Sequence, residues 1–231
     1  MNLIKTVVSS VAVLVLSQNT FAHSSHGHEL TLQKTETLSL SSKHISNFKI
    51  EAGSGKMKIA SADVDAIEVQ AEIYQKESHN NYCLTLKKHG GSAKLESATC
   101  HHNNETRIDL TIKVPKKMNL DIDDGSGPIE VLGVANLTIE DGSGSIKVSQ
   151  ISGKVEIQDG SGRIDIKDVK NDVSIDDGSG AIDVRDISGK VTISDGSGSI
   201  NVDTADSFEL VNDGSGSVHV DNIAGKVEMD N

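Results

Sequence analysis

The 231-residue sequence contains no tryptophan, and aromatic residues make up only 2% of it. A core built around large aromatic anchors is therefore excluded, and small aliphatic side chains must fill the interior. Basic residues are also scarce, with 22 Lys and Arg against 34 Asp and Glu, for a formal net charge of −12. This balance excludes nucleic acid as a partner, because binding to phosphates needs a basic surface that displaces counterions.

Cysteine is nearly absent, and the only two are Cys83 and Cys100, in a polar segment. In an exported chain, a lone pair of cysteines predicts a disulfide. The alternative is a metal site that combines them with some of His89, His101 and His102. No Cys-x-x-Cys pair supports that alternative.

The sequence lacks a hydrophobic run long enough to span a bilayer comfortably. The apolar run from Thr6 to Leu16 is short, follows the basic Lys5 and precedes Thr20-Phe21-Ala22, which resembles a cleavage site. These features predict a secretory signal peptide over residues 1–22. We therefore expect a mature chain that begins at His23, has no membrane span and resides in the periplasm or at the cell surface.

One motif is abundant, Asp-Gly-Ser-Gly, which occurs six times at a spacing of 17 residues once and then 18 residues four times. Its copies begin at Asp124, Asp141, Asp159, Asp177, Asp195 and Asp213. Such a period indicates one supersecondary unit repeated in tandem. Within a unit, Ile182 and Val184, and then Val191 and Ile193, alternate with other residues, which predicts half-buried strands. We expect Gly178, Gly180 and Gly189 to lie at turns, where glycine can reach positive φ at little cost.

A single unit cannot bury enough apolar surface to fold alone, so neighbouring units must stack. The predicted fold class is all-β, a single-stranded parallel β-helix or β-solenoid of about 18 residues per coil. Parallel crossovers favour right-handed winding. A left-handed hexapeptide helix is disfavoured because Ile182, Ile187 and Ile193 are separated by five and then six residues.

Two further features set the domain organisation. Gly53-Ser54-Gly55 follows Ala52, where later units have Asp, which indicates a degenerate first coil. Phe208-Glu209-Leu210-Val211 shifts the apolar register by one residue, which predicts a bulge or a local slip in register. We divide the chain into a signal peptide (1–22), a flexible His-rich N-terminus with a capping strand (23–40), divergent N-terminal coils with a disulfide-containing insert (41–118), and the regular solenoid (119–231).

Val114-Pro115 is followed by Leu120-x-Ile122 and by coils such as Gly142 to Val148, and Gly53-Ser54-Gly55 comes earlier in the chain. In these residues the chain resembles the bacterial DUF4097 family of adhesin-like proteins with β-strand repeats. The resemblance covers about Leu40 to Asn231. It implies a β-strand repeat fold and a binding role at a surface, and it brings no catalytic residues.

Two groups of side chains are candidate metal ligands. Stacking places the motif aspartates in one column, which includes Asp141, Asp159, Asp177 and Asp195. Either turn N–H groups cap these carboxylates or a cation bridges them, and calcium is the natural candidate. The second group, His23, His26 and His28, together with the terminal amine, could bind copper, zinc or nickel. Catalytic copper is disfavoured, because the chain lacks an aromatic-rich β-sandwich.

These observations predict an exported, non-enzymatic β-solenoid that acts as a structural or adhesin-like binding module at the cell envelope. Its partner would be an envelope protein or a glycan, and its open end invites end-to-end self-association. The alternative is an extracytoplasmic metal-binding protein. A polysaccharide-active enzyme ranks third, because a repeated turn explains the acidic residues and there are few aromatic side chains on which a sugar could stack. We expect no catalytic residues and no cofactor.

Overall fold

The computed structural model describes residues 30–78, 81–100 and 106–229, and all regular secondary structure in these ranges is β. No helix able to cross a membrane occurs in this part of the chain. The predicted signal peptide and the predicted ligands His23, His26 and His28 lie outside the described residues.

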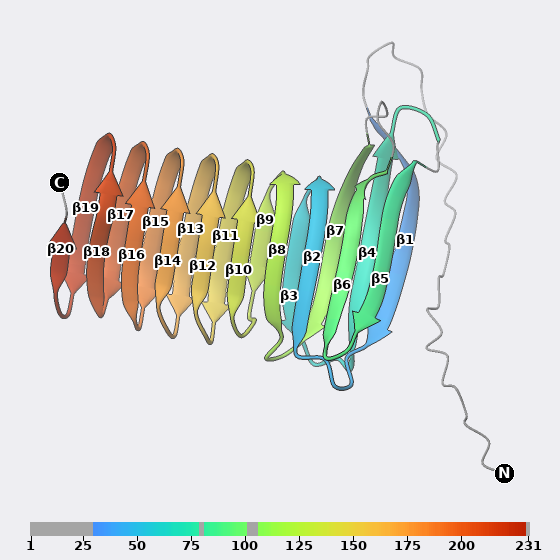
Figure 1. Ribbon diagram of the computed structural model, residues 1–231, viewed down its shortest axis with the longest axis horizontal. Helices are drawn as coiled ribbons and strands as arrows, with labels where there is room; N and C mark the ends of the chain where they lie inside the picture. The colour runs from blue at the N-terminus through green and yellow to red at the C-terminus, as the bar shows by residue number, and fades with distance from the viewer. Residues whose placement is uncertain (1–29, 79–80, 101–105, 230–231) are drawn as a thin grey trace.

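The described residues form twenty strands in two ten-stranded sheets (Figure 1). In spatial order, sheet A contains β1 (Thr31–Ser41), β4 (Ala66–Gln75), β7 (Thr106–Pro115), β3 (Met57–Ala62), β9 (Ile129–Leu132), β11 (Gly144–Ile151), β13 (Gly162–Val169), β15 (Gly180–Ile187), β17 (Gly198–Ala205) and β19 (Gly216–Ile223). From the same end, sheet B contains β5 (Tyr82–His89), β6 (Ser92–Thr99), β2 (Asn47–Ser54), β8 (Asn119–Ser126), β10 (Leu137–Asp141), β12 (Val155–Asp159), β14 (Val173–Asp177), β16 (Lys190–Asp195), β18 (Ser207–Asp213) and β20 (Val227–Met229).

From β8 onward each coil contributes one strand to each sheet, and every strand pairs in parallel with its equivalents in the adjacent coils. In Figure 1 the strands of sheet B run upward in front, those of sheet A run downward behind, and the stack advances from right to left. This winding is right-handed. The prediction of an all-β parallel solenoid with about 18 residues per coil is confirmed.

The core is a set of aliphatic ladders between the two sheets. Ile182 and Val184 from β15 and Val191 and Ile193 from β16 are completely buried, and each stacks on its equivalents in the adjacent coils. Burial of one such side chain stabilises the fold by about 1.5–3 kcal/mol. The stack therefore supplies to each coil the packing that an isolated repeat lacks.

The Asp-Gly-Ser-Gly corner requires glycine for two different reasons. Gly180 has φ +153°, and a Cβ there would lie 1.6 Å from the carbonyl oxygen of the equivalent glycine in the preceding coil. Gly178 does not have positive φ, yet its Cβ would lie 2.5 Å from a carbonyl oxygen of the preceding coil. Gly189, at the opposite corner, likewise lacks positive φ and is crowded by backbone. All three glycines lie at turns, as predicted, but only Gly180 uses positive φ, and close approach between coils explains the other two.

The opposite corner uses non-glycine residues in the left-handed region. One such residue occurs in each coil from β11 onward, with φ between 54° and 66°, whereas the coil of β8 and β9 has Gly133 with φ 77°. The non-glycine residues are Gln150, Asp168, Asp186, Thr204 and Asn222. Asp and Asn tolerate this conformation better than most side chains, whereas for a β-branched residue such as Thr it is strained.

The coil that contains β18 has the predicted bulge. Ile193 pairs with Leu210 and Ser194 with Asn212, so Val211 is the extra residue. Its side chain is half exposed. The bulge restores the 18-residue spacing between Asp195 and Asp213.

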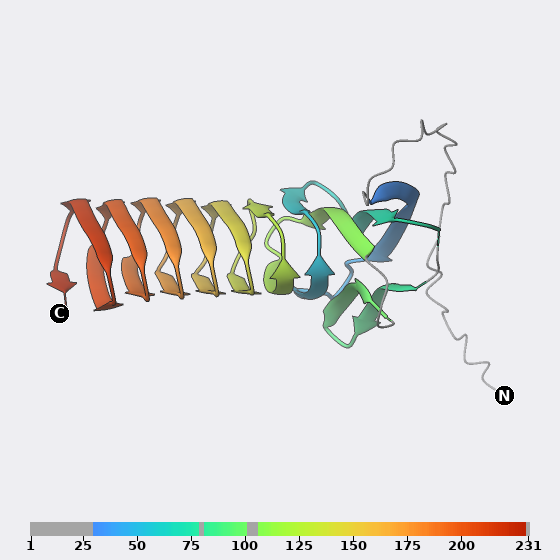
Figure 2. The ribbon, with the colours of Figure 1, turned by 90° about the horizontal axis from the view of Figure 1, so that it is seen from above.

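The N-terminal region departs from the regular winding. The coil formed by β2 and β3 stacks against β8 and β9, with Phe48 beside Leu120 and Ala52 beside Asp124. Beyond it, β4 pairs antiparallel with both β7 and β1, and β5 and β6 form an antiparallel hairpin. These strands form the N-terminal end of the stack (Figure 2).

Candidate functional site

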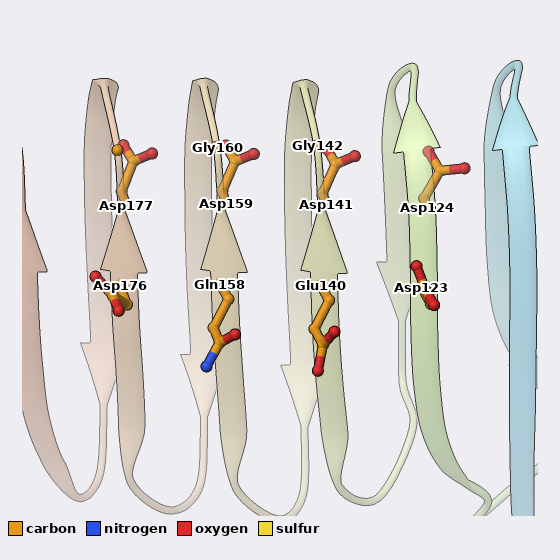
Figure 3. A pocket seen from close by; sticks show the side chains of 11 residues that line it. Asp123, Asp124, Glu140, Asp141, Gly142, Gln158, Asp159, Gly160, Asp176 and Asp177 are labelled. Carbon is orange, nitrogen blue, oxygen red and sulfur yellow. The ribbon is translucent and has the colours of Figure 1, made fainter.

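The candidate site is a groove that runs across the C-terminal ends of four successive strands of sheet B, where each strand enters the Asp-Gly-Ser-Gly corner (Figure 3). Two rows of side chains line it, together with glycines of the turns, and we call it the acidic groove. Its outer row is Asp123, Glu140, Gln158 and Asp176, and its inner row is Asp124, Asp141, Asp159 and Asp177. No Lys or Arg lines it.

Strand alternation places the inner row. In β10, Leu137, Ile139 and Asp141 share one face of the strand, and all three are buried. The aspartate thus takes the third core-facing position, where the strand leaves the aliphatic core and enters the turn. Figure 3 shows the four inner carboxyl groups projecting the same way from the ends of successive strands.

One oxygen of three inner carboxyls, and of Asp195 in the following coil, accepts a hydrogen bond from the turn. Oδ1 of Asp141 accepts a hydrogen bond from the N–H of Ser143 at 3.2 Å, and the same bond recurs at Asp159, Asp177 and Asp195 at 3.0–3.2 Å. This explains the Asp-x-Ser spacing in the motif.

The second oxygen of these carboxyls is buried without a hydrogen-bond partner in the described structure. This holds for Oδ2 of Asp124, Asp141, Asp159, Asp177 and Asp195. The five side chains are at most 7% exposed. An unpaired buried polar atom costs about 1–3 kcal/mol of stability. Each of these coils therefore contains a carboxyl oxygen that can still accept a hydrogen bond or bind a cation.

Burial raises the pKa values of five of the motif aspartates. Loss of solvent and, to a lesser extent, the neighbouring Asp141 carboxylate together raise the pKa of Asp124 to about 7. The same causes raise the pKa of Asp141 and of Asp177 to about 6, opposed by the turn N–H bonds. The pKa values of Asp159 and Asp195 are raised chiefly by burial. Part of the column therefore retains protons close to neutral pH.

The outer row was missed in the sequence analysis, although its signal was present. The residue before the motif is acidic or an amide in the first four copies, as at Asp123 and Glu140. Alternation turns this residue outward, beside the buried aspartate. The two residues together form the groove.

The outer face of sheet A is different, because it carries arginines that pair with aspartates of the adjacent coil. Arg163 forms an ion pair with Asp183, and Arg185 forms one with Asp165 at 3.0 Å. Exposed pairs of this kind add little stability, but they cancel the local charge. Unlike the acidic groove, this face therefore carries basic side chains beside its carboxylates.

The other predicted sites lie apart from the groove. Cys83 and Cys100 form the predicted disulfide, with their Cα atoms 5.4 Å apart, across the open end of the hairpin of β5 and β6. His89 is exposed, and His101 and His102 lie outside the described residues. Among residues 30–78, 81–100 and 106–229, no group of three or more His, Cys, Asp or Glu side chains is arranged to hold a metal ion. Calcium at Asp141, Asp159, Asp177 and Asp195 stays a prediction.

Comparison with known proteins places residues 45–229 within the sequence model of Toastrack DUF4097. A crystal structure of a candidate cell adhesion protein from Clostridium sporogenes is 15% identical, with a TM-score of 0.44, covering 85% of this chain and 98% of that chain. A candidate adhesin from Bacteroides fragilis is 12% identical, with a TM-score of 0.33, covering 86% and 98%. No curated protein matches the chain.

Proposed function

The chain belongs to the Toastrack DUF4097 family, and from that premise we propose that it is an exported, non-enzymatic β-solenoid that acts as an adhesin-like binding module at the cell envelope. The acidic groove is its binding surface. Its partner is an envelope protein or glycan that presents positively charged groups in a row.

This proposal rests on one observation: the same acidic site is repeated in four coils, and no basic residue lines the groove that they form. Stacked strands repeat at about 4.8 Å, so carboxylates at equivalent positions repel one another. A cationic partner relieves that repulsion and replaces lost solvation. Because the sites are equivalent, the groove suits an extended partner that is bound at several points.

The same repetition supports a role without catalysis. Acid–base chemistry needs groups whose environments push their pKa values apart, so that one donates and another accepts a proton. The inner carboxyls share one environment, and all of their resolved shifts are upward. The groove also lacks a Ser, Cys or His side chain that could act as a nucleophile.

Export is supported by the disulfide, because such bonds persist in oxidising compartments. The predicted signal peptide over residues 1–22 points to the same location. The periplasm and the cell surface both fit the proposal.

Calorimetric titration of the chain from His23 onward with polylysine and with chitosan tests the proposal, since these probes are a cationic peptide and a cationic glycan. The groove variant combines Asp123→Asn, Glu140→Gln and Asp176→Asn. A matched control removes three charges elsewhere, with Glu130→Gln, Asp186→Asn and Asp206→Asn. We expect the groove variant to bind at least tenfold more weakly and the control less than threefold. Equal losses in both variants would show attraction to net charge alone and would overturn the proposal.

A second candidate function, calcium binding, is favoured by the unpaired Oδ2 atoms of the inner row. A ligand that binds only the folded state at a hundredfold excess over Kd stabilises it by about 2.7 kcal/mol. Thermal unfolding with calcium, after metal removal, would then show a rise that Asp159→Asn reduces. An unchanged midpoint would remove calcium from consideration.

A further inference from the structure

The last described coil exposes part of the apolar interior of the solenoid. Val218, Val220 and Ile223 of this coil are only partly buried, and Val227 and Met229 are 45% and 47% exposed. Their equivalents one coil earlier are at most 4% exposed. We call this surface the C-terminal end face, and it lies at the far left of Figures 1 and 2.

Both sheets terminate at this face. β19 is the last strand of sheet A and β20 is the last strand of sheet B, and each pairs with a neighbour on one side only within the described residues. Each therefore presents a row of unpaired backbone N–H and C=O groups to an incoming strand.

The opposite end of the stack has a different chemistry. There β1 and β5 are the edge strands, and polar side chains connect them across the two sheets. Tyr82 Oη donates a hydrogen bond to Glu36 Oε1 at 2.5 Å, and Lys34 Nζ contacts both residues. This closed, polar end does not match the apolar C-terminal end face, so head-to-tail stacking is disfavoured.

The C-terminal end face matches itself. On β19, His219 and Asp221 lie on the outer side of Val220, and their side chains are paired at 2.8 Å. At β20, the ion-paired Lys226 and Glu228 flank Val227 in the same manner. When such a strand pairs antiparallel with its own copy about the central valine, each charged residue faces its opposite in the second copy.

Both pairings can share one two-fold axis. Val220 precedes Ile223 by three residues and Val227 follows it by four, so the two valines lie at similar distances from the corner, on facing sheets. A two-fold axis perpendicular to the sheets then passes near both. It relates β19 to its copy and β20 to its copy, both antiparallel, as an isologous interface requires.

We propose that two copies of this chain associate through their C-terminal end faces about this axis. β19 pairs with β19 centred on Val220, β20 pairs with β20 centred on Val227, and the aliphatic core becomes continuous across the interface. This inference is independent of the acidic groove, which lies on coils distant from the end face.

Sedimentation equilibrium of the chain from His23 onward, over a range of concentrations, tests the proposal. We expect a monomer–dimer equilibrium. Val227→Lys places two lysines opposite each other at the axis and should weaken dimerisation at least tenfold. The groove variant described above should dimerise like the unmodified chain.

A charge exchange separates pairing from misfolding of the last coil. Lys226→Glu alone sets glutamates against glutamates and Glu228→Lys alone sets lysines against lysines, so each should weaken the dimer, whereas an equimolar mixture of the two variants restores opposite charges across the axis and should recover it as a heterodimer. Because the ion pair between residues 226 and 228 within one chain is absent from both variants, recovery in the mixture shows that the coil folds and that the pairing is antiparallel. A monomer at all concentrations, an open-ended polymer, or a dimer indifferent to these changes would each overturn the proposal.

Discussion

The two corners of each coil join the same two sheets through different chemistry. At the Asp-Gly-Ser-Gly corner the sequence is identical in all six copies. At the opposite corner the residue with positive φ varies, from Gln150 to Asp168, Thr204 and Asn222. The difference follows from contact between coils. At Gly180 the backbones of successive coils touch and only glycine fits, whereas the positive-φ position of the opposite corner is exposed and requires only a backbone conformation.

We call the Asp-Gly-Ser-Gly corner the tight corner and the opposite corner the permissive corner. A substitution that disrupts the tight corner should have the largest effect on stability. In Gly180→Ala the new Cβ would lie 1.6 Å from a carbonyl oxygen of the preceding coil, at φ +153°. We expect a loss of more than about 3 kcal/mol in the free energy of unfolding, measured by urea denaturation. Gly90→Ala is the control, because Gly90 has φ +61° but no atom within 4 Å of the new Cβ. It should cost only about 1 kcal/mol, and equal losses would refute the steric explanation.

The buried carboxyl of the tight corner should make stability depend on pH. Because the pKa of Asp177 is raised to about 6 in the folded state, the folded state binds more protons than the unfolded state. Stability is therefore lost as pH rises from the ordinary aspartate pKa through about 6. Asp177→Asn keeps the acceptor for the Ser179 N–H and removes the charge, so we expect a gain of about 1–3 kcal/mol at pH 8.

Thermal unfolding at pH 5 and pH 8 measures this effect. The variant should reduce the difference in midpoint between the two pH values. The exposed neighbour Asp123 provides the control, since Asp123→Asn should change stability by less than about 0.5 kcal/mol. A destabilised Asp177→Asn at pH 8 would show that the ionised carboxylate is the favoured form.

The permissive corner should show the smallest effect. Thr204 is a β-branched residue at φ 66°, where the equivalent residue of the next coil is Asn222. Thr204→Asn should stabilise the protein by about 0.5–1 kcal/mol, because Asn tolerates this conformation better. Thr192→Asn, on a strand of sheet B, should have no such benefit. Stabilisation of both variants, or of neither, would contradict the assignment of strain to Thr204.

The repeat was predictable because its signals are local. Alternation gave the strands, and the 18-residue period gave the stacking, so residues 119–229 matched the prediction closely. The N-terminal arrangement was not predictable in the same way. The alternating residues of β4 and β7 indicate strands, but nothing in their spacing shows that β7 pairs with β3 and β4 or that β1 forms the edge. Those neighbours are distant in sequence, and no period connects them.

Only part of the candidate site was predictable from the sequence. The inner aspartates and the disulfide followed from motif and composition. The pairing of Asp141 with Glu140 in one groove did not, because it depends on the strand bringing a buried and an exposed side chain to the same corner. The upward pKa shifts depend likewise on burial that the motif alone does not reveal.

Asparagine contacts between successive coils connect residues at very different separations along the chain. Asn119 Nδ2 donates to Asn47 Oδ1 across 72 residues, whereas Asn136 Nδ2 donates to Asn119 Oδ1 across 17. A loop four times longer costs about 1.2 kcal/mol more entropy to close. On loop entropy alone, we therefore expect regular coils to join one after another and the coil of β2 and β3 to join them later. Position along the chain and order of assembly would then run in opposite directions at this end of the stack.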